Sequence, residues 1–264
     1  MEIKKQHILE AASELFLEKG YTSTSMQDVA EGCNVSKATL YKFFQSKESL
    51  GIMGMFYLTG QMTERVEKVV SAGNMAPRDI LRESIIIRME RCADRNRFID
   101  ELLFSLPQDQ RENYLPAINK SRFDIFELFS GIIMKAFGLE NETIASELTL
   151  NLNGLIKEIT FIAGETILEL DERKTADFII DSLEAIMEKR RNKKSLMTEE
   201  QLTALRKAFC DEGKMLRSVL RKKRLMGSLR GTLDDYEKNG RTLSLQEAEA
   251  IIGELKQLEE SEEV

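Results

Sequence analysis

The chain has 264 residues, 42% of them hydrophobic, and a formal net charge of −7. This length is enough to bury a sizeable core and allows one or two domains. Only three prolines and no tryptophan are present, and residues that favour helices are abundant, so we predict an all-α protein. The acidic balance excludes attraction to DNA through net charge, and any such attraction must come from local placement of basic residues.

Targeting signals and metal-binding patterns are missing from the sequence. No charged and then apolar leader stands at the N-terminus, and no apolar run approaches the length of a membrane span, so we expect a cytoplasmic protein that does not bind membranes. Cys33, Cys92 and Cys210 are isolated and lack the spacing of metal ligands, which predicts no metal and no cofactor. Buried, inert thiols are expected, with a redox sensor at Cys92 or Cys210 as the alternative.

The segment from Thr24 to Leu50 predicts two short helices joined by a tight turn and followed by a third helix. Thr24 and Gln27 have the spacing of a capping box, which predicts that the first helix begins there. The small or turn-tolerant residues 32–34 mark the bend, and Ser36 is a good N-cap for the second helix. This is the layout of a helix-turn-helix DNA reader.

The second helix has one packing face and one face that can contact DNA. Leu40, Phe43 and Phe44 lie three and four residues apart and are expected to pack inward. The side chains that project elsewhere are Lys37, Thr39, Tyr41 and Lys42. No acidic residue occurs between Ser36 and Lys47, so the segment is a modest basic patch. Lys47 follows the N-cap Ser46, where a cation is unfavourable unless an anion such as a DNA phosphate is near.

Together these residues resemble the DNA-binding domain of the tetracycline-repressor (TetR/AcrR) family of bacterial regulators. The resemblance begins upstream, in the first helix and its glycine-aromatic exit, and runs to residue 50, with Ala38 and Cys33-Asn34 as departures. Its positions are Ile8, Ala11, Ala12, Leu15, Phe16, Gly20, Tyr21, Thr22, Ser25, Met26, Val29, Ala30, Val35, Ser36, Lys37, Thr39, Leu40, Tyr41, Phe44, Lys47, Glu48 and Leu50. It implies a sequence-specific regulator, most simply a repressor, that binds double-stranded DNA at a palindromic operator. The residues it assigns to DNA are Thr24, Ser25, Ser36, Lys37, Thr39, Tyr41, Lys42 and Lys47, with Lys47 and either Thr24 or Ser25 on phosphates.

Three domains are expected: a helix-turn-helix domain over residues 1–47, a helical regulatory and dimerisation domain over 48–191, and a helical extension over 192–264. In the middle region a long helix from residue 47 should end near Gly73 and Pro77. We further expect a break at Arg95-Asn96, a segment closed by Pro107, and a helix opened by Pro116 that ends at Gly138.

Methionine and phenylalanine are frequent in the middle region and could line a cavity for a small hydrophobic effector, although most of them are expected to fill the core. The resemblance implies an effector site framed by the long helix and those after it. The candidate residues are Phe56, Met89, Phe104, Phe126 and Phe129. A neutral or amphipathic, mostly apolar molecule is the expected effector.

The two helices expected over residues 142–191 are too apolar for either of them to have one side in water. The resemblance implies that these last two helices form a four-helix bundle with a second copy. A homodimer also suits DNA geometry, because two recognition helices must enter major grooves about one helical turn apart.

Residues 192–264 lie beyond the resemblance. A basic helix over 198–226, with a capping box from Thr198 to Gln201, precedes an acidic helix opened by Ser244. Matching apolar stripes predict a hairpin that docks on the core or swaps across the dimer. The alternatives are a second nucleic-acid contact through residues 189–194 and 221–224, or docking of a partner protein, with membrane attachment less favoured.

No enzymatic activity is expected. The only histidine is His7, and neither a phosphate-binding glycine loop nor metal-ligand spacing occurs. Two regulatory hypotheses stay open: release from DNA by a hydrophobic effector, or control by a protein partner or an architectural role through the extension.

Overall fold

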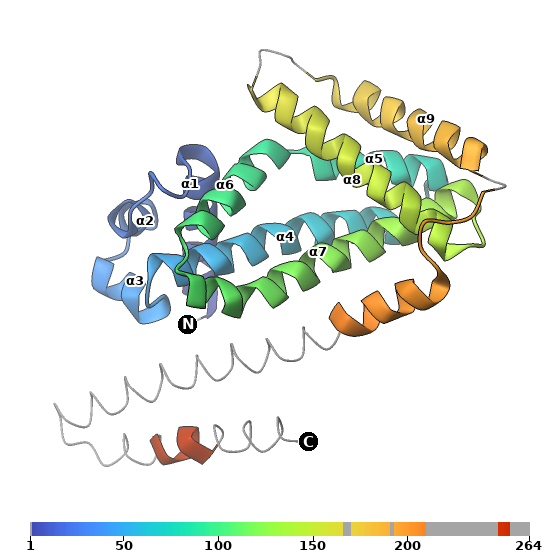
Figure 1. The fold of residues 1–264 in the computed structure, drawn as a ribbon. Coiled ribbons are helices and arrows are strands. Elements are labelled where there is room, and N and C mark those ends of the chain that lie inside the picture. Colours follow the sequence, from blue (N-terminus) through green and yellow to red (C-terminus); the bar gives the residue numbers. More distant parts are fainter. Residues whose placement is uncertain (1, 166–169, 191–192, 210–247, 254–264) are drawn as a thin grey trace. The chain divides into compact units, whose positions relative to one another are not determined.

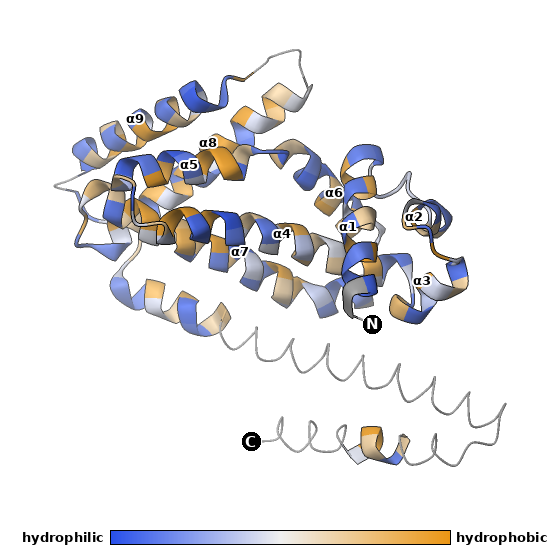
Figure 2. Ribbon diagram, turned by 180° about the vertical axis from the view of Figure 1, so that it is seen from behind, coloured by the Kyte–Doolittle hydropathy of each residue, from blue (hydrophilic) through white to orange (hydrophobic). Residues whose placement is uncertain are grey.

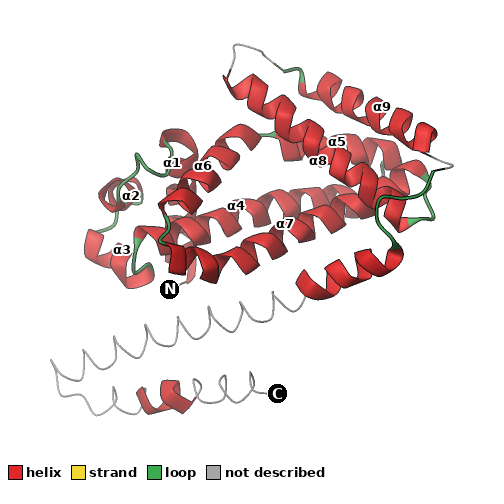
Figure 3. Cartoon of the chain, viewed as in Figure 1, coloured by secondary structure: helices red, strands yellow, loops and turns green. Residues whose placement is uncertain are grey.

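All regular secondary structure that is described in this computed structural model is helical (Figure 1, Figure 3). The structure describes residues 2–165, 170–190, 193–209 and 248–253. The predicted all-α fold is confirmed for these residues. Within them, no helix is long and apolar enough to cross a membrane.

Nine helices are labelled along the described chain. They are α1 (Glu2–Lys19), α2 (Met26–Gly32), α3 (Lys37–Phe43), α4 (Lys47–Ser71), α5 (Pro77–Met89), α6 (Cys92–Ser105), α7 (Gln108–Phe137), α8 (Glu142–Glu165) and α9 (Glu172–Arg190). Residues 199–209 and 248–253 are also helical.

The chain forms two compact units. The first comprises residues 1–111 and 121–205, and the second comprises residues 112–120 and 206–264. In the first unit α1 packs on α2, α4 and α6, and α9 packs on α5 and α8. The three-domain division expected from the sequence stays a proposal.

Two helix boundaries differ from the sequence expectation. The chain breaks at Arg91, which is left-handed with φ +50°, and not at Arg95-Asn96. Arg95 explains the shift, because its guanidinium donates to the carbonyls of Arg88, at 2.7 Å, and Glu90 at the end of α5. Pro116 opens no helix, since α7 begins directly after Pro107 and continues through it.

Helix α7 tolerates Pro116 although a proline inside a helix forfeits one backbone hydrogen bond. Tyr114, Ala117 and Ile118 lie at helical spacing around it and are all buried. Burial of that apolar side favours one continuous helix over a boundary at the proline. The expected end at Gly138 is confirmed, with a left-handed φ of +60°.

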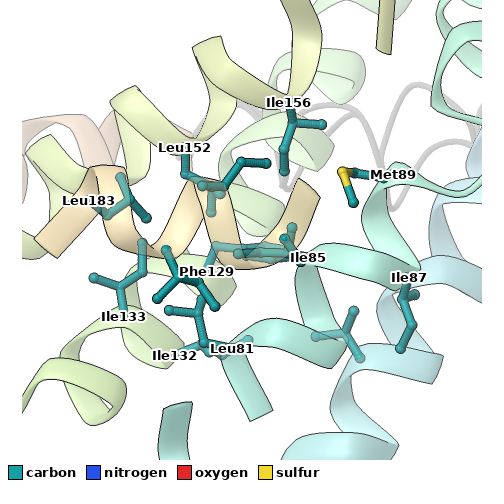
Figure 4. Packing of buried hydrophobic residues seen from close by; sticks show 14 of the residues in the cluster. Leu81, Ile85, Ile87, Met89, Phe129, Ile132, Ile133, Leu152, Ile156 and Leu183 are labelled. Atoms are coloured by element: carbon teal, nitrogen blue, oxygen red, sulfur yellow. The ribbon is translucent and has the colours of Figure 1, made fainter. Parts of the chain in front are cut away.

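The main core lies among α4, α5, α7, α8 and α9 (Figure 4). Phe129 of α7 is fully buried at its centre, against isoleucines and leucines of the neighbouring helices. The labelled members are Leu81, Ile85, Ile87, Met89, Phe129, Ile132, Ile133, Leu152, Ile156 and Leu183. Burial of this cluster holds these five helices together.

The start of the C-terminal extension is tied to α8 by a buried carboxylate. Glu147 accepts hydrogen bonds from Ser195 Oγ at 2.5 Å, from the backbone of Leu196, and from Arg190 Nε at 2.9 Å. The capping box from Thr198 to Gln201 is confirmed in both directions, at 3.0 and 3.2 Å. The parts of the predicted hairpin over residues 210–247 and 254–264, which include residues 221–224 and Ser244, lie outside the described residues.

Candidate nucleic-acid interface

The N-cap of α2 lies one residue later than predicted. Ser25 is the N-cap: its hydroxyl accepts from the Asp28 backbone at 3.1 Å, and the Asp28 carboxylate accepts from the Ser25 backbone at 2.7 Å. The expected Thr24–Gln27 box is therefore wrong. Thr24 is buried and its hydroxyl donates instead to the Gly20 carbonyl at 2.8 Å, which closes the exit of α1.

The turn between α2 and α3 is built around Asn34 and Cys33. Asn34 is left-handed, with φ +53°, a conformation that asparagine tolerates better than most residues. The Val35 backbone donates to the Ala30 carbonyl at 2.9 Å, which closes the bend. Cys33 is buried, and this burial raises the pKa of its thiol. The departure at Cys33-Asn34 is thus compatible with the turn.

Helix α3 presents the predicted face to solvent. Ser36 caps it, accepting from the Thr39 backbone at 3.1 Å, and the two hydroxyls lie 2.8 Å apart. Leu40 is fully buried, whereas Lys37 and Lys42 are exposed and Tyr41 is 44% exposed. The exposed side of α3 thus carries two cations and a phenol ring.

Lys47 lies at the start of α4 and folds back on the domain. Its Nζ lies 4.3 Å from the centroid of the Tyr21 ring and 3.5 Å from the Thr22 carbonyl. Desolvation lowers the pKa of Lys47, against the opposing effect of Glu48, Glu101 and Asp28. This cation therefore lies beside the contact between α1 and α4.

Helix α6 holds the N-terminal domain through polar contacts and an aromatic cluster. Glu101 accepts from the backbone and hydroxyl of Thr22 at 2.8 and 2.9 Å, and Arg97 donates to the Leu17 carbonyl at 2.8 Å. Phe98 stacks on Phe16 with ring centroids 5.1 Å apart. Helix α6 therefore contacts both α1 and the segment that follows it.

Gly51 permits α4 to approach Tyr21 and α6 closely. A Cβ atom built there would lie 2.7 Å from the Tyr21 ring and 2.9 Å from Leu102 of α6. No other residue fits without displacing a buried ring. Tyr21 is almost fully buried, which raises its pKa to about 12.

Sequence reasoning missed Glu101, Arg97 and Gly51, which lie where α1, α4 and α6 meet. The sequence pattern around the two charged residues indicates an ordinary solvated helix face, because their partners Thr22 and Leu17 lie 79 and 80 positions away. Gly51 in a helical pattern was a visible signal, since a glycine in a helix interior costs about 1 kcal/mol relative to alanine and implies a packing reason.

The structure separates the five candidate effector residues. Met89 and Phe129 lie together in the main core. Phe104 is 88% exposed on α6 and belongs to no core. Phe56 and Phe126 are half-buried, and Phe126 stacks on Phe123 with centroids 5.9 Å apart. In the part of the chain that the structure describes, no group of histidine, cysteine or acidic residues is arranged to hold a metal.

The fold and the N-terminal motif define a helix-turn-helix DNA-binding protein with a helical second domain. Residues 8–51 match the family model described as bacterial regulatory proteins, tetR family. Residues 8–51 therefore form a DNA-binding segment of the type found in this family of transcriptional regulators.

Similarity to curated proteins extends beyond the motif. The chain is 26% identical over 210 residues to the uncharacterized HTH-type transcriptional regulator YuxN of Bacillus subtilis, across 78% of this chain and 71% of that protein. It is 46% identical over 46 residues to IcaR of Staphylococcus aureus, the negative transcriptional regulator of the biofilm operon icaADBC, across 17% of this chain and 25% of that protein.

Among solved structures, a putative transcriptional regulator from Saccharomonospora viridis in complex with choline has the same fold. It matches with a TM-score of 0.57 at 15% identity, over 70% of this chain and 97% of that chain. This likeness concerns the fold alone.

Proposed function

We propose that the protein is a sequence-specific DNA-binding transcriptional regulator that reads a palindromic operator with α3. The observation that carries the proposal is the exposed side of α3, where Lys37, Tyr41 and Lys42 stand free of acidic neighbours along the helix while Leu40 anchors it. A helix of this kind enters the major groove, and side chains on its outer face contact base edges and phosphates.

Ser25 is the better of the two proposed phosphate contacts before α2. It is exposed at the helix N-terminus, where its hydroxyl caps α2 through Asp28, whereas Thr24 is buried and its hydroxyl donates to the Gly20 carbonyl. Lys47 is proposed to act beside it: moving from the Tyr21 ring toward a phosphate would pair its charge with an anion and relieve its desolvation. Ser36 and Thr39 are proposed to contact DNA from the start of α3.

A homodimer through α8 and α9 is the proposed active form. These helices expose large apolar side chains that a monomer would leave in water, and α9 carries hydrophobic and hydrophilic positions side by side (Figure 2). The exposed set is Leu150, Phe161, Ile162 and Phe178. Of these, Ile162 and Phe178 line a shallow groove of about 430 Å³ together with Ile159 and Leu170. Covering this surface with a second copy places two α3 helices on one operator.

The regulator is proposed to be a repressor released by an amphipathic, mostly apolar effector that binds the second domain. The IcaR relative is a negative regulator, and its similarity covers the DNA-binding segment. The contacts of Glu101 and Arg97 of α6 with the end of α1 supply a route by which a change in core packing could reach α2 and α3. We propose no catalytic role and a cytoplasmic location.

Control through the C-terminal extension is the second candidate. Glu147 fixes residues 195–196 to α8, so a protein that grips the extension could pull on a core helix. Removing residues 206–264 tests this candidate, because unchanged operator occupancy in cells would exclude it.

Selection of binding sites from a random pool of duplex DNA tests the proposed function. Wild type should enrich an inverted repeat whose half-sites are centred about one helical turn apart. Recovery of no common sequence, together with equal affinity for selected and unselected DNA, would contradict the proposal.

A further inference from the structure

The side chain of Arg88 is largely buried and has no carboxylate partner among the residues that the structure describes. It lies in the last turn of α5, and its Nη1 atom is buried with no hydrogen-bond partner. Its guanidinium carbon lies 4.8 Å from the centroid of the Phe129 ring, at the centre of the main core. Its charged neighbour is a second arginine, Arg95.

Other arginines of the same region are paired. Arg65 forms two hydrogen bonds to the Glu90 carboxylate, at 2.6 and 2.8 Å. Arg82 bonds to Asp177 at 2.5 Å and also to Asp79. Pairing is the general rule for a charge removed from water, because an uncompensated one is costly.

The partly buried Arg95 beside Arg88 has a structural use of its own. Its guanidinium donates to the carbonyls of Arg88 and Glu90 and so closes the end of α5. Arg88 has no such use, and the proximity of Arg95 makes its position less favourable still. Burial accordingly lowers the pKa of Arg88 to about 10, which leaves it charged at neutral pH. The aromatic ring of Phe129 supplies only a partial substitute for an anion.

We propose that Arg88 is the anion-recognising residue of the effector site and that the effector is an amphipathic carboxylate whose apolar chain inserts beside Phe129 and Met89. This inference rests on the proposed effector control and names the chemical class that the site takes. A carboxylate can accept the free Nη1–H and neutralise the pair of arginines, and a guanidinium fork binds it in two-point geometry. The side chains around Phe129 are apolar and match a hydrocarbon chain rather than a sugar.

A set of matched ligands tests the contribution of the effector's head group separately from that of its apolar chain. Decanoate, decanol, acetate and decyl phosphate are added below their micelle concentrations, and the melting temperature and dissociation constant are measured. Decanoate should raise the melting temperature through binding linkage, and decanol and acetate should do so far less. Decyl phosphate tests whether the site prefers a carboxylate, and a larger shift with it would reassign the head group to a phosphate.

Two variants on α5 locate the effect. Arg88→Met should weaken decanoate binding at least about tenfold, the loss expected for a hydrogen bond to a charged group, and should abolish the preference for acid over alcohol. Arg88→Lys should keep part of that preference. The control is Arg78→Met, on the first turn of the same helix, where Arg78 pairs with Asp181 and Glu184 at the surface; it should bind decanoate like wild type.

Urea denaturation excludes a merely structural role. Because Arg88 is an uncompensated charge, Arg88→Met should fold with stability equal to or above that of wild type. Equal binding of decanoate and decanol by wild type, or unchanged acid preference in Arg88→Met, would overturn the inference. If either of these results is found while wild type still binds its operator, only the effector inference fails. If wild type binds no operator, the proposed DNA-binding function fails, whatever the ligand measurements show.

Discussion

Glu101 of α6 holds Thr22, at the exit of α1, through two hydrogen bonds to one carboxylate oxygen, at 2.8 and 2.9 Å. These residues are 79 positions apart in the sequence, and they join the helix that borders the core to the domain that reads DNA. Gly20, with φ +86°, approaches the same carboxylate so closely that a Cβ there would lie 3.0 Å from it.

Replacing Glu101 with alanine should loosen the N-terminal domain. The pair is exposed, so we expect a loss in the free energy of unfolding of about 1 kcal/mol or less. Operator affinity should change more, because α3 is then held less firmly in the orientation that DNA binding requires. Calorimetry and an anisotropy titration of operator DNA measure the two effects.

The matched control for this variant is Asp100→Ala, which removes the neighbouring exposed carboxylate on the same helix. It should leave both stability and affinity unchanged. Equal affinity losses in the two variants would mean that general charge, and not the contact with Thr22, sets the effect.

Gly51→Ala should destabilise the protein, because the added methyl group meets the Tyr21 ring and Leu102. Overpacking of this kind typically costs 1–3 kcal/mol, so we expect a decrease of about 2 kcal/mol in urea denaturation. Gly60→Ala, in the same helix with open space around its Cβ position, should instead stabilise by up to about 1 kcal/mol. Two variants of equal effect would contradict the close approach.

Glu147 should make the stability dependent on acid pH. Burial raises the pKa of its carboxyl, but hydrogen bonds from Ser195, Leu196 and Arg190 outweigh it and hold the pKa below the ordinary value of 4.5. A carboxyl with a lowered folded pKa stabilises the fold above its unfolded pKa and loses that contribution as the pH falls through the folded pKa.

Glu147→Gln should therefore cost about 1–3 kcal/mol at pH 6 and progressively less as the pH falls below about 4.5. Urea denaturation at a series of pH values measures the difference from wild type. The exposed Glu158 on the same helix is the control, and Glu158→Gln should follow the wild-type profile. A difference at pH 6 that persists unchanged at pH 3 would refute the assignment.

Phe178→Glu should dissociate the proposed dimer without unfolding the chain. Phe178 is 59% exposed on α9 and lines the apolar groove, so a charge there is harmful only when a second copy covers it. Ile180, by contrast, is fully buried in the main core, and a charge there would damage the monomer itself. Light scattering of wild type, Phe178→Glu and the control Phe104→Glu measures the outcome. A wild type that is monomeric at micromolar concentration would contradict the dimer.

The N-terminal motif could be predicted from the sequence because its determinants are local. The caps Ser36 and Ser46, the turn at Asn34 and the buried Leu40 follow from spacing within a few residues. Thr24 shows the limit of this reasoning, since a capping sequence is also satisfied by the neighbouring Ser25, and the carbonyl of Gly20 competed for the threonine hydroxyl.

The effector site could be predicted only as a region. Periodicity placed Met89 and Phe129 in the core but did not distinguish Phe104, which the turn of α6 directs into solvent. The unpaired state of Arg88 was invisible as well, because pairing depends on which helices pack together, and that is a tertiary property.

The central claim is that α3 reads the operator, and a substitution on its exposed side tests this claim most directly. Anisotropy titrations of a selected operator fragment at several salt concentrations should show that Lys42→Ala binds more weakly than wild type and that its dependence on salt is shallower by about one unit in log–log slope. Lys68→Ala, which removes an exposed cation paired with Glu64 on α4, should bind like wild type. If Lys42→Ala keeps the wild-type affinity and salt slope, α3 is not the DNA-reading helix.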